Sequence, residues 1–308
     1  MADQSRTEVE IDAMMYRARM PAIAMLPVPR DEQGNPLGEG TPGCRLGGAP
    51  SLPPEYEWPT FTFSERPFEG VQLPMQFVLQ MNLQYLPRVI GLPELPPKGT
   101  LFVFYEPISA SMPWSFKDRT LPPMLTGDCV RLIYHPDEVS DEMRRPPPQM
   151  PDVSELVEKG FAVFDEDAPP LADEECSFDY FVVDTFKFNG PNAADGWRAI
   201  ELSEKQSAAM RCAQGWDRYD DPRGVGLAPA YMNLLFGAPH HLGPSPTREN
   251  FDQLGAHHFP ALADDYVRLF RLPYAMIAWG DQILGYWIHR EDLAKSDFSK
   301  ILIWMEDL

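Results

Sequence analysis

The chain has 308 residues, a formal net charge of −20 and a mean hydropathy of −0.31. The negative charge argues against binding to nucleic acid or to an anionic membrane, because both require a basic surface. No stretch long enough to span a membrane is free of charges and prolines, and the N-terminus lacks a secretory signal, so we expect a cytoplasmic protein.

Proline makes up 34 of the residues, about twice its usual share, which favours short strands joined by long loops. Residues 8–20 contain neither Pro nor Gly and have apolar residues at a rough helical spacing, so an N-terminal helix is predicted within a lead-in over residues 1–30. Runs rich in β-branched and aromatic residues predict strands at residues 76–83, 100–105, 130–134, 161–164, 178–188, 266–272, 283–288 and 300–305. Further helices are predicted at residues 201–214 and 290–294.

These elements indicate an α+β fold class, with mainly mixed or antiparallel sheet, few helices and long proline-rich loops. Residues 31–308 are expected to form one domain. The order of strand, loop, Gly and aromatic strand over residues 77–105 recurs over residues 267–288. This recurrence raises the hypothesis of an internal duplication, with half-repeats at about 46–190 and 191–308.

Five sequence blocks, in this order, resemble the YwqG-like family of bacterial proteins of unknown function. They are residues 46–53 (Leu-Gly-Gly-Ala-Pro-Ser-Leu-Pro), 57–59 (Glu-Trp-Pro), 77–83, 95–105 and 280–298. The sequence departs from the family pattern in its second half, where Arg271 stands in place of a Gln. The resemblance implies an α+β domain and no established reaction. Some family members are encoded beside secreted toxins, so the resemblance also implies a link to toxin immunity.

No catalytic, nucleotide or metal motif is recognisable, and we predict no cofactor and no metal. The histidines at 240, 241, 257 and 258, with Asp252, Asp264 or Asp265, do not have the spacing of a standard metal site. An acid/base cluster of Asp281, His289 and Glu291 is disfavoured, because one extended strand would hold Asp281 and His289 about 25 Å apart. The chain is therefore more naturally a non-enzyme.

Acidic residues concentrate between residues 152 and 184, which contain eleven acidic residues and only one lysine, Lys159. One interpretation is a solvated segment that aids solubility, and the other is a surface that docks a basic protein. The predicted partner-binding residues are Asp165, Glu166, Asp167, Asp173, Glu174, Glu175 and Asp179.

The function predicted is a non-enzymatic, acidic, cytoplasmic protein-binding protein, in its specific form an immunity protein that neutralises a basic toxin domain. The alternative is a small-molecule-binding pocket protein or an enzyme of unrecognised type. Its pocket candidates are Trp58, Trp279, Asp281 and Trp287, although aromatic residues near Pro and Gly also pack as core side chains under loops.

Overall fold

The structure is a computed structural model that describes residues 19–31, 33–62, 70, 72–105, 124–125, 130–149, 175–186, 233–236, 265–273 and 282–307. Its strands are β1 (Arg19–Pro27), β2 (Arg45–Leu46), β3 (Thr60–Thr62), β4 (Gln72–Pro74), β5 (Gln76–Asn82), β6 (Thr100–Tyr105), β7 (Met124–Leu125), β8 (Val130–His135), β9 (Cys176–Phe186), β10 (Asn233–Phe236), β11 (Tyr266–Pro273), β12 (Gln282–His289) and β13 (Ile301–Asp307). The helical elements in these ranges are the 3-10 turns η1 (Leu83–Tyr85) and η3 (Asp141–Met143) and the helix α6 (Arg290–Ala294).

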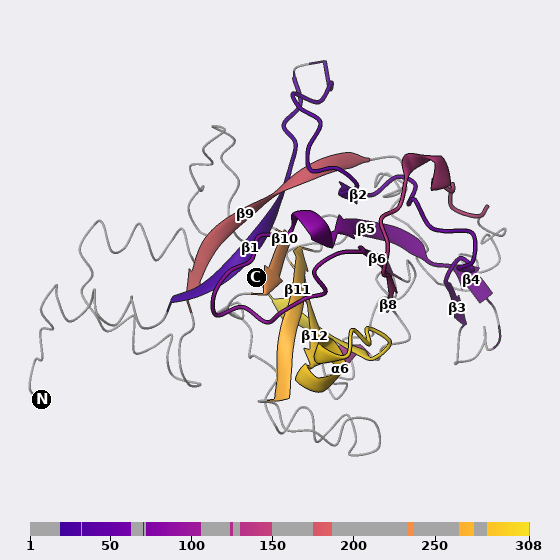
Figure 1. The fold of residues 1–308 in the computed structure, drawn as a ribbon. Helices are drawn as coiled ribbons and strands as arrows, with labels where there is room; N and C mark the ends of the chain where they lie inside the picture. The colour runs from indigo at the N-terminus through magenta and orange to yellow at the C-terminus, as the bar shows by residue number, and fades with distance from the viewer. Residues whose placement is uncertain are drawn as a thin grey trace, which may run out of the picture.

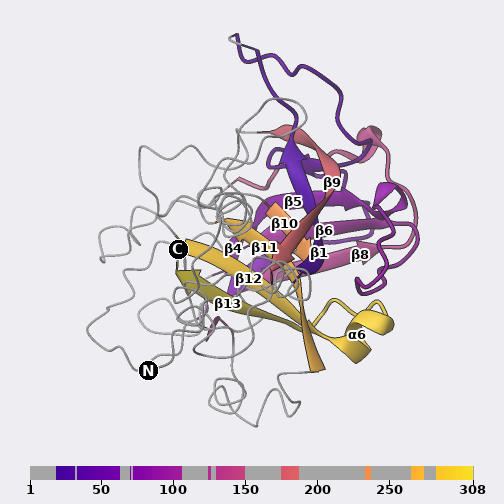
Figure 2. The same cartoon turned by 90° about the vertical axis from the view of Figure 1, so that its left-hand side faces the viewer.

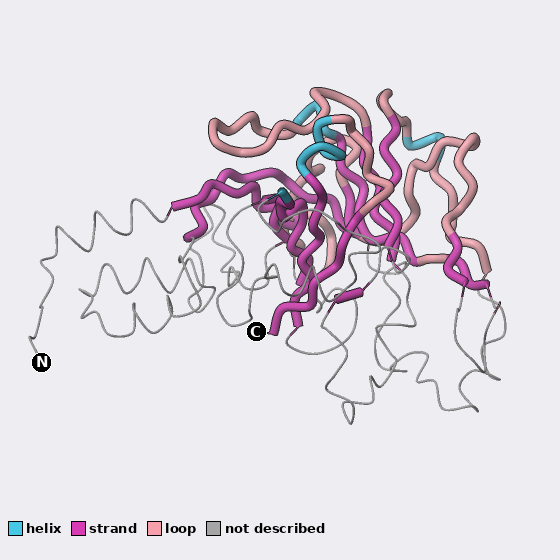
Figure 3. The backbone as a smooth tube through the Cα atoms, turned by 90° about the horizontal axis from the view of Figure 1, so that it is seen from below, coloured by secondary structure: helices cyan, strands magenta, loops and turns pink. Residues whose placement is uncertain are grey.

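One sheet of eleven strands dominates the described residues (Figure 1), in the order β7-β13-β12-β11-β10-β1-β9-β2-β5-β6-β8. Its neighbouring strands pair antiparallel, and β3 and β4 form a separate two-stranded sheet. Figure 3 shows how little of the described chain is helical. The fold is therefore mainly β, and the predicted α+β class is wrong.

The N-terminal part of the chain shows why that prediction failed. Residues 22–26 are almost completely buried, as expected for a central strand covered on both faces. Its apolar run contains two alanines and lies between Pro21 and Pro27, so local β propensity did not identify it as a strand. Arg19 and Met20, at the end of the predicted helix, already belong to β1, and residues 1–18 lie outside the described residues.

Most of the predicted strands are confirmed. β5, β6, β8, β9, β11, β12 and β13 match the predictions to within a few residues, and α6 matches residues 290–294. The strand predicted at 161–164 and the helix at 201–214 lie outside the described residues. The predictions missed β1, β2, β3, β4, β7 and β10.

The sheet is strongly curved, so that its two ends approach each other and it is nearly closed (Figure 2). The ring of Tyr134 on β8 lies 5.8 Å from that of Phe298, just before β13. Both faces of β6 are covered: Val103 and Tyr105 belong to the main core, whereas Phe102 and Phe104 pack in a second cluster with Trp58. This two-sided burial explains why β6 has no polar face.

Ten of the eleven strands repeat one arrangement twice. In sheet order, β2, β5, β6 and β8 run outward from β9, while β10, β11, β12 and β13 run outward from β1. In chain order β1 comes before β2, and β9 comes before β10. In the sheet these first strands are exchanged: β1 pairs with β10, and β9 pairs with β2. The two sets are thus interlocked through the central pair of β1 and β9.

Local geometry supports the same correspondence. A register shift falls between Phe77 and Leu79 in the pairing of β5 with β6, and between Arg268 and Phe270 in that of β11 with β12. Gly47, just after β2, has φ 63°, and Phe236, at the end of β10, has φ 62°. The sequence Gly-Ala-Pro follows at residues 48–50 and again at residues 237–239.

Candidate functional site

The first Gly-Ala-Pro loop leaves β2 through two left-handed glycines. Gly47 has φ 63° and donates its N–H to the carbonyl oxygen of Val78 at 2.9 Å, and Gly48 has φ 70°. A Cβ on Gly48 would lie 2.2 Å from Oε2 and 2.7 Å from Cβ of Glu175, closer than real Cβ contacts occur. Gly48 therefore allows the Glu175 side chain to lie directly against the loop.

Gln80 on β5 holds the two ends of this loop together. Its side chain is fully buried, and its Oε1 accepts a hydrogen bond from the backbone N–H of Ser51 at 2.8 Å. Its Nε2 donates to the carbonyl oxygen of Gly43 at 3.0 Å. One amide thus satisfies the buried N–H of Ser51 and the partly buried carbonyl group of Gly43.

Arg45, the register partner of Gln80, is a buried cation with a side chain only 7% exposed. Its Nη2 donates to Oδ1 of Asp141, and its Nη1 lies 3.7 Å from Oε1 of Glu175 and 3.4 Å from the carbonyl oxygen of Ala49. A guanidinium taken out of water is strongly destabilising unless carboxylates compensate its charge. Asp141 in η3 and Glu175 just before β9 provide that compensation.

Asp141 connects this buried charge to solvent. Its Oδ1 accepts from Arg45 and, at 3.4 Å, from Oγ of Ser51, while 76% of its side chain is exposed. The hydrogen bond from Arg45 lowers the pKa of Asp141 below its ordinary value, so the carboxylate stays ionised in mildly acidic solution.

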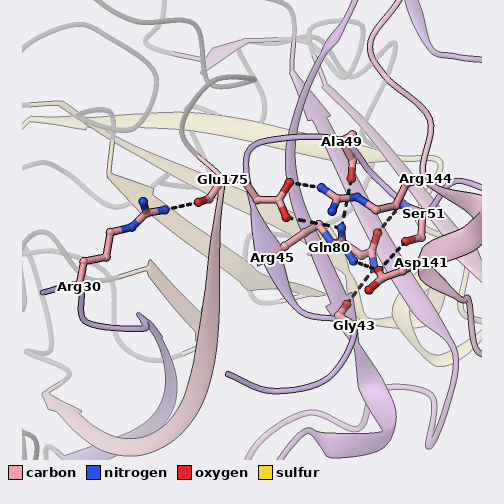
Figure 4. Close-up of polar contacts among 9 residues, drawn as sticks. All are labelled: Arg30, Gly43, Arg45, Ala49, Ser51, Gln80, Asp141, Arg144 and Glu175. Carbon is pink, nitrogen blue, oxygen red and sulfur yellow. Dashed lines mark hydrogen bonds and ion pairs between the residues drawn. The ribbon is translucent and has the colours of Figure 1, made fainter. Parts of the chain in front are cut away.

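Glu175 joins three segments of the chain (Figure 4). Arg144 donates to its Oε2, Arg45 lies beside its Oε1, and Arg30 donates to its carbonyl oxygen. We name the set Arg45, Ser51, Gln80, Asp141, Arg144 and Glu175 the Arg45 network. Because Arg144 and Glu175 are in contact, the chain between them leaves the Arg45 network and returns to it.

Two of the seven predicted partner-binding residues are described, and both have internal partners. Glu175 belongs to the Arg45 network, and Oδ1 of Asp179 accepts from Oγ1 of Thr41 at 3.1 Å. The others, Asp165, Glu166, Asp167, Asp173 and Glu174, lie outside the described residues.

The pocket candidates that are described do not form a site together. Trp58 is 8% exposed, donates its indole N–H to the carbonyl oxygen of Met75 at 2.8 Å and packs edge-on against Phe104 at 5.3 Å. It is a core side chain. Trp287 lies half-buried on β12, in the other set of strands, while Trp279 and Asp281 lie outside the described residues.

The remaining candidates for chemistry have structural roles where they are described. The His289 ring caps α6, with its Nδ1 accepting from the backbone N–H of Glu291 at 3.2 Å. The described residues contain no group of three or more His, Cys, Asp or Glu that could hold a metal ion. The histidines at 240, 241, 257 and 258 lie outside them.

Cys44, between the 28–40 segment and β2, is a poor nucleophile. Its Sγ lies 3.2 Å from the Tyr180 hydroxyl oxygen and accepts from the backbone N–H of Asn82 at 3.3 Å. Burial raises the pKa of the Cys44 thiol to about 11, so the reactive thiolate is scarce at neutral pH.

Sequence reasoning missed Arg45, Gln80, Asp141 and Arg144. A signal for two of them is present, because Gln80 interrupts a buried apolar run and Arg45 adjoins the Leu-Gly-Gly-Ala-Pro block. No local pattern points to Asp141 or Arg144, since 96 residues separate Asp141 from Arg45.

A family model described as a domain of unknown function (DUF1963) matches residues 44–306. The chain belongs to this family. No curated protein matches it significantly. In the part of the chain that the structure describes, no helix has both the length and the apolar character needed to cross a membrane.

Proposed function

We propose that the chain is a non-enzymatic, cytoplasmic binding protein that docks a basic protein through the acidic segment of residues 150–174. The observation that carries the proposal is the contact between Arg144 and Glu175, which lie on the two sides of this segment. The segment contains eight acidic residues and one lysine, a net charge of −7. The two ends of the acidic segment therefore join the rest of the chain close to each other.

This attachment favours binding for a physical reason. Charge concentrated at one place steers an oppositely charged protein toward that place and increases the association rate.

The pairings of the Arg45 network decide which acids are free to bind. The Glu175 carboxylate is held by Arg144 and Arg45, so its loss would disturb the fold as well as a partner. A test of binding therefore leaves Glu175 intact and changes residues 165–167, which lie well inside the segment.

The first experiment retains proteins from the native organism on the tagged full chain at about 0.1 M and about 1 M salt, where the Debye length is roughly 10 Å and 3 Å. We expect one basic protein that is retained at low salt and lost at high salt. Its association rate is then measured with the triple variant Asp165→Asn, Glu166→Gln and Asp167→Asn, and should fall by about three- to tenfold at low salt.

A matched control has the same net charge. Glu57, Glu94 and Glu138 are exposed, and replacing all three with Gln also changes the net charge from −20 to −17. If the control slows association as much as the segment variant, overall charge explains the binding and the segment does not. If the chain retains no basic protein, the proposal is wrong.

Two finer assignments belong to the same proposal. The first is that the chain is a YwqG-like member of its family, as the Leu-Gly-Gly-Ala-Pro block and the Gln80 strand suggest. The second is that the basic partner is a toxin domain and the chain its immunity protein, or antitoxin. The partner expressed alone should then inhibit growth, and co-expression of the chain should restore it.

A further inference from the structure

A hairpin over residues 28–40 projects from the sheet between β1 and β2 (Figure 1, indigo). Arg30 and Pro36 form an antiparallel bridge, and Leu37 donates its N–H to the carbonyl oxygen of Pro29 at 2.7 Å. Residues 33–39 are all exposed. We name this segment the 28–40 hairpin.

The tip of the 28–40 hairpin is ordered by its own hydrogen bonds. Oδ1 of Asp31 accepts from the backbone N–H groups of Gln33 at 2.9 Å and Asn35 at 2.8 Å. The N–H of Gly34 donates to the carbonyl oxygen of Asp31 at 3.0 Å. These bonds fix the turn, so the hairpin reaches a partner without first losing much conformational entropy.

The base of the hairpin is fixed to β9. The N–H of Val28 donates to the carbonyl oxygen of Ser177 at 2.8 Å, and the N–H of Thr41 donates to that of Phe178 at 3.0 Å. Gly40 packs so closely that a Cβ there would lie 2.7 Å from Cβ of Ser177. The hairpin is therefore attached to the strand that begins where the acidic segment ends.

Leu37 presents an apolar side chain on this rigid support, with 68% of its surface exposed. The same hairpin carries charged groups: Asp31 and Glu39 are acidic, while the Arg30 guanidinium is already engaged by the carbonyl oxygens of Gly34 and Glu175. A single exposed leucine is common, but a leucine held on a fixed projection that also carries the negative charges of Asp31 and Glu39 matches the apolar centre and charged rim of a protein interface.

We propose that the 28–40 hairpin is the apolar contact for the basic partner. Leu37 enters an apolar pocket of that protein, and Lys or Arg residues around the pocket pair with Asp31 and Glu39. The contact from Arg30 to Glu175 makes this surface continuous with the end of the acidic segment. The inference rests on the proposed function and gives the two parts different roles in binding: the acidic segment increases the association rate, and Leu37 decreases the dissociation rate.

The test compares two exposed apolar residues. Ile90 is 100% exposed in a loop distant from the hairpin in sequence, which makes Ile90→Ala the matched control for Leu37→Ala. Neither substitution removes a backbone hydrogen bond or buried packing, so both variants should keep the stability of the parent chain. Against the basic protein retained by the full chain, Leu37→Ala should increase the dissociation rate about tenfold at both low and high salt, as for a central interface residue. Ile90→Ala should leave it unchanged.

The full chain carrying the photo-crosslinker p-benzoylphenylalanine at position 37, or at position 90, identifies what contacts the hairpin. A crosslink from position 37 alone to the same basic protein supports the inference. A crosslink to a second copy of the chain, or equal dissociation rates for the two alanine variants, overturns it. If Leu37→Ala has no effect while the segment variant slows association, the hairpin assignment is wrong and the proposed function stands. If the full chain retains no basic protein, both are wrong.

Discussion

Replacing Gly48 with Ala tests the central claim about the Arg45 network. The φ of 70° is unfavourable for any residue with a Cβ, at about 1–2 kcal/mol. The new Cβ would also lie 2.2 Å from Oε2 of Glu175, so the Glu175 side chain must turn away from Arg144 and Arg45. A charged hydrogen bond contributes about 1.5–3 kcal/mol, so Gly48→Ala should lower the free energy of unfolding by about 2.5–5 kcal/mol.

Gly91→Ala separates these two causes. Gly91 has φ 93°, and a Cβ there would meet nothing within 4 Å, so only the backbone conformation opposes the alanine. Its expected loss is about 1–2 kcal/mol. Urea unfolding of the full chain measures both losses from the transition midpoint and slope.

The same argument predicts coupling between Gly48 and Glu175. In a Glu175→Ala background the ion pairs are already absent, so Gly48→Ala should be milder there by about 1.5–3 kcal/mol. Equal losses for Gly48→Ala and Gly91→Ala, or the same loss in both backgrounds, would refute the structural account of the glycine.

Three other predictions concern single side chains. Gln80→Leu should lower the free energy of unfolding by about 1–3 kcal/mol in urea titrations, because it leaves the Ser51 N–H buried without a partner and removes the hydrogen bond to the partly buried carbonyl oxygen of Gly43; a loss below about 0.5 kcal/mol would contradict the role of Gln80. Since the pKa of Asp141 is lower in the folded protein than in the unfolded chain, its stabilising contribution is complete above the unfolded value near 4 and disappears as the pH falls through the folded value. Urea unfolding should therefore separate Asp141→Asn from the parent at pH 6, and the gap should narrow as the pH falls below 4; a gap that stays constant down to the lowest pH at which the parent folds would exclude this linkage. With a pKa of about 11, Cys44 should alkylate with iodoacetamide at pH 8 at least about 100-fold more slowly in the folded chain than in urea, as peptide mass spectrometry would show; equal rates would mean that the thiol is not buried.

Local sequence was sufficient to predict the strands that consist of an uninterrupted run of β-forming residues. The run Thr100 to Tyr105 is β-forming throughout and became β6, and the acids at the start of residues 290–294 favour the helix that α6 forms. The two-residue strand β2 carries too little sequence to be recognised. β1 was missed because its apolar run contains two alanines and lies between Pro21 and Pro27, and alanine and proline are both depleted in strands.

The sequence by itself determined the charge of the protein, its acidic segment, the family resemblance and most strand positions, because each depends on composition or on neighbouring residues. Only the tertiary structure decided that β1 and β9 exchange between two sets of strands and that residues 45, 80, 141 and 175 meet in one network. Those contacts join residues far apart in the chain, and a buried arginine is tolerated only where its carboxylates arrive from elsewhere. Local sequence patterns therefore do not predict these contacts.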